Sequence, residues 1–299
     1  MATRCPEHIA IQGAELQSIP IPNYAEFQVP KVAVAKTGSI PGNFNVPRSI
    51  MIEPQSGNFY VADSGNKRIQ IFSNTGEYIN KFGEEHLTNP WGILFHQDSI
   101  YITDICHNAI LQFKLKDFTL VKKVGQKGDG KKEFDGPRQP AISHKHLIYV
   151  PDEYNERIQI LTPDLDFHAE LRNNDMSSPA DIIFRNDKMF VLSCDDLTCI
   201  YVFDLKGEFI RCFITMGEGM QITRGMFFCM DGHNNFIITD WLEDDIKVIS
   251  PEGQLLHTIG KYGYKPGTYS YPAGIVIQNN TNLICVSENR HFGLQIYVS

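Results

Sequence analysis

Carboxylates return along this chain at nearly equal intervals. Each follows a short β-branched or aromatic run, and a cysteine takes the place of the acid in the fourth repeat; the six positions are Asp63, Asp104, Asp152, Cys194, Asp240 and Glu288. Carboxylates gathered on one face could bind a cation or a basic peptide. Each could instead accept hydrogen bonds from the amides of its own turn, as aspartate does in Asx turns. Because the acid recurs in nearly every repeat, we interpret these residues as structural turn acids.

Arginines form a second recurring set, at the start of the short apolar run that begins each repeat. In chain order, the six starts are Pro47-Arg48, Pro90-Trp91, Pro137-Arg138, Pro179-Ala180, Thr223-Arg224 and Pro272-Ala273. If the repeats surround one axis, the three guanidinium groups converge there with Trp91 beside them. They would repel one another, so they either pair with the turn acids or bind an anionic group of a partner. Arginine holds carboxylate or phosphate through parallel hydrogen bonds, and tryptophan adds a stacking face.

Lysines are concentrated in residues 125–140, GQKGDGKKEFDGPRQP, which we place on the same face as the arginines. The candidate ligand-binding surface therefore consists of Arg48, Trp91, Arg138, Arg224, Lys127, Lys131 and Lys132. Acidic residues in the same segment nearly cancel the charge of the lysines, which weakens the case for an RNA-binding patch.

Metal chemistry has weaker support in the sequence. The residue three positions after the acid is His107, Glu243 or His291 in three of the repeats, and these are plausible zinc ligands. Cys194 and Cys199 flank one turn and could form a disulfide or remain reduced. The sequence has no G-x-S-x-G elbow and no P-loop. We predict no catalytic residue, no metal and no cofactor.

Composition narrows the kind of partner. The 299 residues include 27 basic and 35 acidic side chains, for a net charge of -8, which is opposite to the usual balance of a domain that binds phosphate backbones. Neither a secretory signal nor an apolar run long enough to span a membrane is present. We therefore expect a cytoplasmic, monomeric protein without membrane association, which binds a protein or peptide, with RNA as the alternative.

One repeated segment determines the architecture. An apolar residue lies six positions after each turn acid or its cysteine replacement, and these residues are Ile69, Ile110, Ile158, Ile200, Ile246 and Leu294. We expect them in the core. Each repeat also has a short apolar run before this segment and a more polar run after it, which indicates four strands per repeat of roughly 45 residues. The sequence thus predicts an all-β fold, a six-bladed β-propeller of four-stranded blades.

The last repeat ends after its third strand, and residues 29–38 would supply the fourth and close the ring. We therefore divide the chain into an N-terminal arm, 1–28, lying over the outside, and a propeller, 29–299. The expected blades are 39–83, 84–125, 126–171, 172–214, 215–260, and 261–299 completed by 29–38.

The phrase YVADSGNKRIQIF (60–72), followed by GEYINKFG (76–83) and accompanied elsewhere by Pro-x-Gly-Ile (90–93), resembles the NHL repeat. The resemblance covers residues 29–299 and is least in the fourth repeat. It implies a propeller of the kind that recruits substrates for RING-type ubiquitin ligases, binds RNA in translational repressors, or occurs alone. No RING, B-box or coiled-coil segment precedes the repeats, so we expect no ligase activity from these residues. A six-bladed relative, the peptide-amidating lyase, keeps a metal-dependent enzyme as a third possibility.

Overall fold

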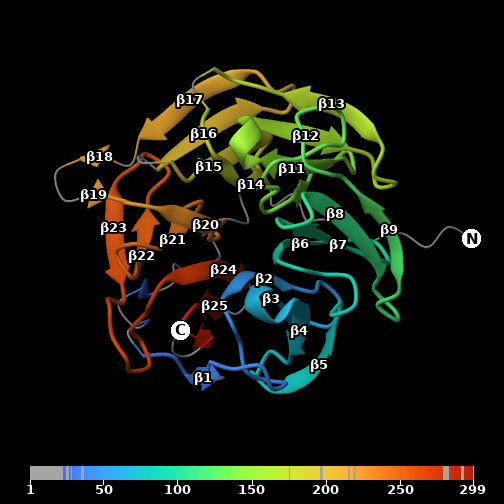
Figure 1. The fold of residues 1–299 in the computed structure, drawn as a ribbon. Helices are drawn as coiled ribbons and strands as arrows, with labels where there is room; N and C mark the ends of the chain where they lie inside the picture. The colour runs from blue at the N-terminus through green and yellow to red at the C-terminus, as the bar shows by residue number, and fades with distance from the viewer. Residues whose placement is uncertain are drawn as a thin grey trace, which may run out of the picture.

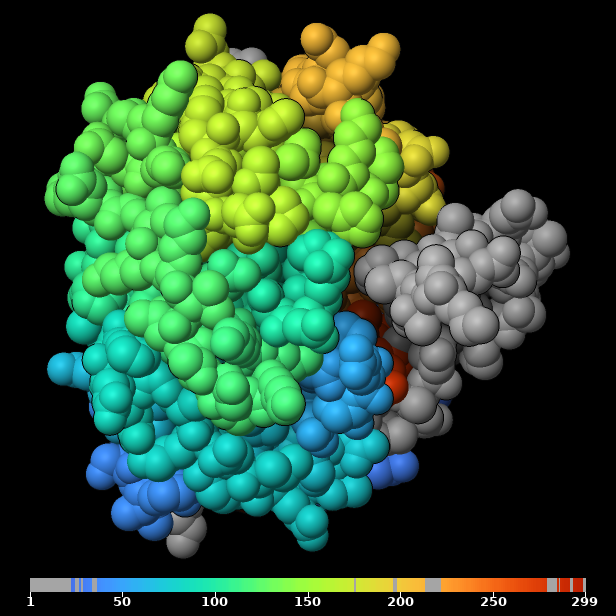
Figure 2. Space-filling model, turned by 90° about the vertical axis from the view of Figure 1, so that its right-hand side faces the viewer, coloured from blue at the N-terminus to red at the C-terminus, as the bar shows by residue number. Residues whose placement is uncertain are grey.

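The chain folds as a ring of six antiparallel sheets around a central axis (Figure 1). The computed structural model describes residues 23–24, 27, 29–34, 37–174, 176–195, 198–214, 216–217, 220–278, 283–290 and 293–298. Each sheet has four strands, in chain order from the axis outward in blades 1 to 5. Seen from its edge, the molecule presents segments of successive blades stacked from blue and cyan to yellow-green (Figure 2). The prediction of an all-β, six-bladed propeller is confirmed.

The blades follow one another directly along the chain. Blade 1 contains β2 (Pro47–Ile52), β3 (Phe59–Asp63), β4 (Arg68–Phe72) and β5 (Tyr78–Phe82). Blade 2 contains β6 (Pro90–His96), β7 (Ser99–Asp104), β8 (Ala109–Lys114) and β9 (Leu120–Val124). Blade 3 contains β10 (Ala141–Ile142), β11 (Ile148–Asp152), β12 (Arg157–Leu161) and β13 (Phe167–Leu171).

The second half of the ring repeats this arrangement. Blade 4 contains β14 (Pro179–Arg185), β15 (Lys188–Ser193), β16 (Cys199–Asp204) and β17 (Phe209–Ile214). A small hairpin, β18 (Met216–Gly217) and β19 (Met220–Gln221), precedes blade 5, which contains β20 (Gly225–Met230), β21 (Phe236–Asp240), β22 (Asp245–Ile249) and β23 (Leu255–Ile259). Blade 6 contains β24 (Pro272–Gln278), β25 (Leu283–Glu288) and β26 (Leu294–Val298).

The N-terminal strand β1 (Val32–Val34) completes blade 6. It pairs antiparallel with β26, with Ala33 opposite Gln295. This pairing joins the two ends of the chain in one sheet and removes a free sheet edge from the last blade. The predicted closure of the ring is confirmed.

The arm predicted at residues 1–28 needs correction at its C-terminal end. Residues 1–22 lie outside the described residues. Tyr24 and Phe27, however, are 3% and 1% exposed and pack in the core between blades 5 and 6, rather than over the outside. Tyr24 donates a hydrogen bond to the buried Asp231, and the Phe27 ring meets Tyr297 edge-on at 6.1 Å. These aromatic side chains anchor the segment that leads into β1.

The core lies between neighbouring blades. The six apolar residues at the constant offset are all buried, at 0% or 1% exposure: Ile69, Ile110, Ile158, Ile200, Ile246 and Leu294. Ile69 packs in one cluster with Ile93 and Ile102 of blade 2, so this position joins adjacent sheets. Within the described ranges, no helix has the length and apolar character needed to cross a membrane.

Candidate binding site at the propeller axis

The turn acids accept hydrogen bonds from backbone amides of the connection that leads into the inner strand of the same blade. Asp63 Oδ1 accepts from Asn45 N, and Asp152 Oδ1 accepts from Asp135 N, both at 2.7 Å. The other acids, each with its amide donors, are Asp104 with Thr88 and Asn89, Asp240 with Thr223 and Arg224, and Glu288 with Ser270. These carboxylates hold the starts of the inner strands in place.

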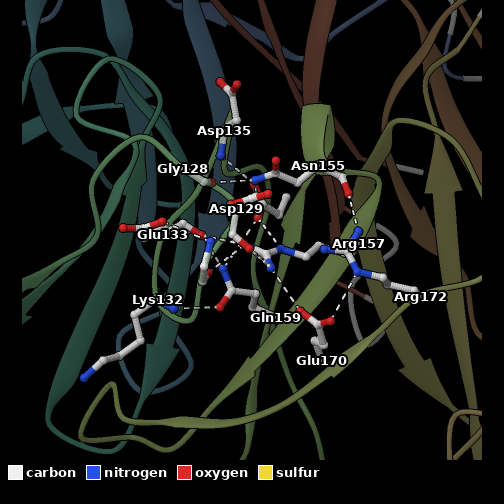
Figure 3. A network of polar contacts seen from close by, with 12 residues as sticks. Gly128, Asp129, Lys132, Glu133, Asp135, Asn155, Arg157, Gln159, Glu170 and Arg172 are labelled. Carbon is white, nitrogen blue, oxygen red and sulfur yellow. Dashed lines mark hydrogen bonds and ion pairs between the residues drawn. The ribbon is translucent and has the colours of Figure 1, made fainter.

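Buried arginines strengthen this arrangement in blades 1 and 3. Arg68 and Arg157 are 2% and 1% exposed, and each donates from Nε to the turn acid of its own blade at 2.8 Å. Arg157 also donates to three carbonyl oxygens of the preceding loop, those of Asp129, Gly130 and Glu133 (Figure 3). Our sequence analysis missed these arginines. The signal was present, because Asp-x-x-Asn-x-Arg-x-Gln occurs at residues 63–70 and again at 152–159.

Arg48 and Arg138 meet at Trp91, next to the propeller axis. Their guanidinium carbons lie 4.4 Å and 3.9 Å from the centroid of the Trp91 ring, within cation–π distance. Arg138 is 6% exposed and forms an ion pair with Glu153, which also accepts a hydrogen bond from the Cys194 thiol at 3.4 Å. Burial and the Glu153 charge raise the pKa of Cys194 to about 12.

Arg48 has no comparable partner. Its Nε and Nη1 are buried and make no hydrogen bond, and it forms no ion pair within the described part of the chain. Burial, together with the neighbouring charges of Arg138 and Arg224, lowers the pKa of Arg48 to about 10. The exposed Arg224 has no ion-pair partner among the described residues either, and its guanidinium carbon lies 5.9 Å from the Trp241 ring. Only one of the three arginines is therefore neutralised by a carboxylate.

A polar bridge is formed by Ser49 and Gln139, the residues that directly follow Arg48 and Arg138 in the sequence. Ser49 Oγ donates to Gln139 Oε1 at 2.7 Å, which connects blade 1 to blade 3. Gln139 Nε2 donates to Ile93 O at 2.8 Å, and Ile93 N donates to Gln139 Oε1 at 3.2 Å. The buried Gln139 therefore links three blades next to the arginines and holds Arg138, its neighbour in the chain, in position. The sequence analysis did not single out Gln139, because no other repeat has glutamine there.

The lysines of the 125–140 loop are not brought together with the arginines. Lys132 Nζ lies 3.5 Å from Asp166, in the turn before the outer strand β13, and Lys131 Nζ lies 5.1 Å from the Phe167 ring. Gln159 Oε1 accepts from Lys132 N, and the lysine side chain points away from the network (Figure 3). Lys127 Nζ lies 3.4 Å from Asp135. The loop is folded around Arg157, which directs Lys131 and Lys132 to the outer side of blade 3.

The weak metal candidates are not assembled into a site by the described residues. His107 Nδ1 lies 3.6 Å from Asp104, and Glu243 accepts a hydrogen bond from Thr223 at 2.9 Å, while His291 falls outside those residues. Among the residues that the structure describes, no group of three His, Cys, Asp or Glu side chains could hold a metal ion.

The two flanking cysteines of blade 4 have different partners. Cys194 and Cys199 are both free thiols, so they form no disulfide with each other. A hydrogen bond with Cys212 lowers the pKa of Cys199 to about 7.

Comparison with known proteins gives four observations. Residues 44–72 match the family model described as NHL repeat. The human E3 ubiquitin-protein ligase TRIM32 is 24% identical over 278 residues, which cover 85% of this chain and 36% of that protein. The human NHL repeat-containing protein 3 is 39% identical over 72 residues, 22% of this chain and 20% of that protein. A solved streptogramin B lyase superposes with a TM-score of 0.62 at 13% identity, over 89% of this chain and 97% of the lyase.

The arrangement of six four-stranded sheets defines a closed six-bladed β-propeller. The likeness to the lyase, at 13% identity, reflects this fold alone. Within the class, residues 44–72 match the NHL repeat and the chain is similar to TRIM32 over 85% of its length, so this propeller contains an NHL repeat and resembles NHL-repeat proteins. It spans 36% of TRIM32 and 20% of the second relative, so the activities of those whole proteins do not transfer to it directly.

Proposed function

We propose that this propeller is a non-catalytic binding module that recognises a protein or peptide partner at its axis. The observation that carries the proposal is the Arg48 guanidinium, held over Trp91 beside two like charges and without a hydrogen-bond partner for Nε and Nη1. A partly buried cation without a counter-ion is unfavourable. A carboxylate from a partner would relieve this cost by offsetting the charge of Arg48 and by bonding to the exposed Arg224, and the indole would provide an apolar contact.

Two further observations support a protein partner. The net charge of -8 disfavours long polyanions, whereas a single acidic side chain or a chain terminus needs only a local positive site. TRIM32, similar over 85% of this chain, is named as a ubiquitin ligase, and ligases must recruit protein substrates. We do not extend ligase activity to this chain, and our predictions of a monomer and of a cytoplasmic location stay predictions.

Tryptophan fluorescence tests the proposal directly, because Trp91 and Trp241 are the two tryptophans of the sequence. In a Trp241→Phe background, Trp91 alone reports on the site. We expect hexaglutamate to change this emission in a saturable, salt-sensitive way, and hexalysine to leave it unchanged. Arg48→Met should abolish the response, whereas the control Lys132→Met, at the outer side of blade 3, should retain it. An unchanged hexaglutamate titration in Arg48→Met would refute the proposal.

Single-stranded RNA is the second candidate, and one group of side chains favours it. The Trp241 and Tyr271 rings lie 4.6 Å apart, and Arg290 lies 4.6 Å from the Tyr271 centroid. Aromatic rings interleaved with arginines are typical of surfaces that stack bases. Titration of the protein that retains Trp241 with oligouridylate and with hexaglutamate, followed by tryptophan fluorescence, distinguishes the two candidates. Binding tighter than that of hexaglutamate, with a steep dependence on salt, would replace the peptide proposal with the RNA one.

A further inference from the structure

A cavity of about 280 Å³ opens between blades 3 and 4, away from the axial arginines. Its wall includes the apolar side chains of Tyr149, Ile160, Leu171, Phe184 and Met189. The outer strand β13 and the turn between β16 and β17 form its sides. This site belongs to neither the arginine cluster nor the residues that the sequence analysis considered.

The interface between blades 1 and 2 has the same framework. By strand register, Tyr60 corresponds to Tyr149, because each is opposite the matching isoleucine of the next strand. Tyr60 meets Phe95 edge-on with ring centroids 4.9 Å apart, and Tyr149 meets Phe184 edge-on at the same separation. The two interfaces therefore contain equivalent edge-on pairs of a tyrosine and a phenylalanine ring.

Between blades 1 and 2, a side chain of the protein itself fills the space that corresponds to the cavity. Phe118, in the turn before the outer strand β9, stacks on Phe82 with centroids 4.4 Å apart and planes 9° apart. In blade 4, Gly207 takes the place of Phe118. Each has a positive φ, 58° for Phe118 and 88° for Gly207, and each donates its amide to the last residue of the third strand. Leu171 takes the place of Phe82. The cavity is the space that a stacked phenyl ring occupies one interface earlier.

The interfaces on either side of blades 3 and 4 are filled differently. Between blades 2 and 3, the corresponding turn residue is Leu165, which is 0% exposed and fills the interface. Between blades 4 and 5, the turn has Gly253, but Arg211 of β17 reaches that turn and donates to Pro251 O at 3.4 Å. The register counterpart of Arg211 in blade 3 is Ala169, which is too short to cross the cavity.

The rim of the cavity has a positive charge, Lys206, that forms no ion pair within the described residues. Its acids are already engaged: Glu170 pairs with Arg157 and Arg172 at 3.0 Å and 3.2 Å, and Asp204 accepts amides of its own turn. Lys206 is exposed. The positive charge of Lys206 would therefore favour an acidic group next to a side chain that binds in the cavity.

We propose that this cavity binds one aromatic side chain of a peptide partner, with an adjacent acidic residue at Lys206. The phenyl ring of Phe118 on Phe82 shows the geometry that the framework accepts. Residues 1–22 contain no aromatic residue, so that segment of the chain cannot supply the ring. Aromatic side chains in preformed pockets are common anchors of peptide recognition. The proposal is independent of the function proposed for the axis, because the two sites share no residue.

Methyl-labelled NMR with acetyl-Phe-Asp-amide as the probe tests the proposal. We expect saturable shifts at Ile160, Leu171 and Met189, and none with acetyl-Ala-Asp-amide. Ala169→Phe should remove these shifts by filling the cavity. Asn80→Phe, at the register counterpart in the interface that Phe118 already fills, is the matched control and should leave them intact. Shifts that persist in Ala169→Phe, or no saturable shift in the wild type, would overturn the proposal.

Lys206→Gln tests the charge without changing the core. It should weaken acetyl-Phe-Asp-amide roughly two- to five-fold, as expected for an exposed ion pair, and leave acetyl-Phe-Asn-amide unchanged. Equal weakening of both peptides would contradict the acidic part of the proposal. Hexaglutamate binding at Trp91 should be unaffected by Ala169→Phe, so a failure of one site is distinguishable from a failure of the other.

Discussion

Replacing Arg157 by methionine should be one of the most destabilising single substitutions in the propeller. The guanidinium is 1% exposed and donates to Asp152, Glu170 and three loop carbonyls. Methionine retains the apolar stem and removes every donor. Asp152 would keep its bonds from Asn155 and the Asp135 amide, but its buried charge would lose the cation that balances it. Breaking a buried pair in this way costs roughly 3–5 kcal/mol.

The assay is urea unfolding followed by tryptophan fluorescence, with the melting temperature measured in parallel. At about 2–4 °C per kcal/mol for a large domain, the melting temperature should fall by roughly 6–20 °C. The matched control is Arg172→Met, because Arg172 is 47% exposed and shares the Glu170 carboxylate. That substitution should cost about 0–1 kcal/mol, as surface pairs do. If Arg157→Met were no more destabilising than Arg172→Met, the loop would not depend on the network in Figure 3.

Two other predictions concern ring closure and pH. Deleting residues 1–38 removes β1 together with the buried Tyr24 and Phe27, whose truncation costs roughly 3–5 kcal/mol each. Cooperative unfolding should therefore be lost, or the melting temperature should fall steeply. Deletion of residues 1–22 is the control, and equal melting temperatures of the two truncated proteins would contradict the closure model. Burial raises the pKa of Asp245 from 3.8 to about 6 against the opposing charge of its lysine partner, so its stabilising contribution is complete below about pH 4 and is lost as pH rises through about 6. The wild type should therefore lose stability over this window relative to Asp245→Asn, and parallel stability curves for the two proteins would contradict the assignment.

The repeat spacing was sufficient to predict the ring, because a propeller imposes the same constraint on every blade. An apolar residue six positions after the turn acid must face the next sheet. The positions of Ile69 and its counterparts therefore indicate where the strands of each of the six blades lie in the sequence. The closing strand followed from the absence of a fourth strand in the last repeat. Tyr24 and Phe27 were missed because two aromatic residues in an irregular segment have no periodicity. Their burial depends on a gap between blades 5 and 6 that only the assembled ring creates.

The candidate site was less predictable, because side-chain direction depends on contacts between segments far apart in the sequence. The convergence of Arg48 and Arg138 on Trp91 follows from their equivalent positions in successive blades. The pairing of Arg138 with Glu153 does not, since Glu153 follows its turn acid directly and no other turn acid is followed by an acidic residue. The cavity between blades 3 and 4 depends on one turn position, where Gly207 replaces a phenylalanine.

The contrast between Arg157 and Arg48 separates what stabilises this propeller from what is left for recognition. Both side chains are arginines largely shielded from water at the starts of strands. Arg157 has acceptors for all of its nitrogens, whereas Arg48 Nε and Nη1 have none and its neighbours are two further cations. Within the described residues, no turn acid forms an ion pair with Arg48, whereas Asp63 and Asp152 pair with Arg68 and Arg157. Folding therefore gains little from the charge of Arg48, and under the function proposed above a carboxylate of the partner would offset this charge.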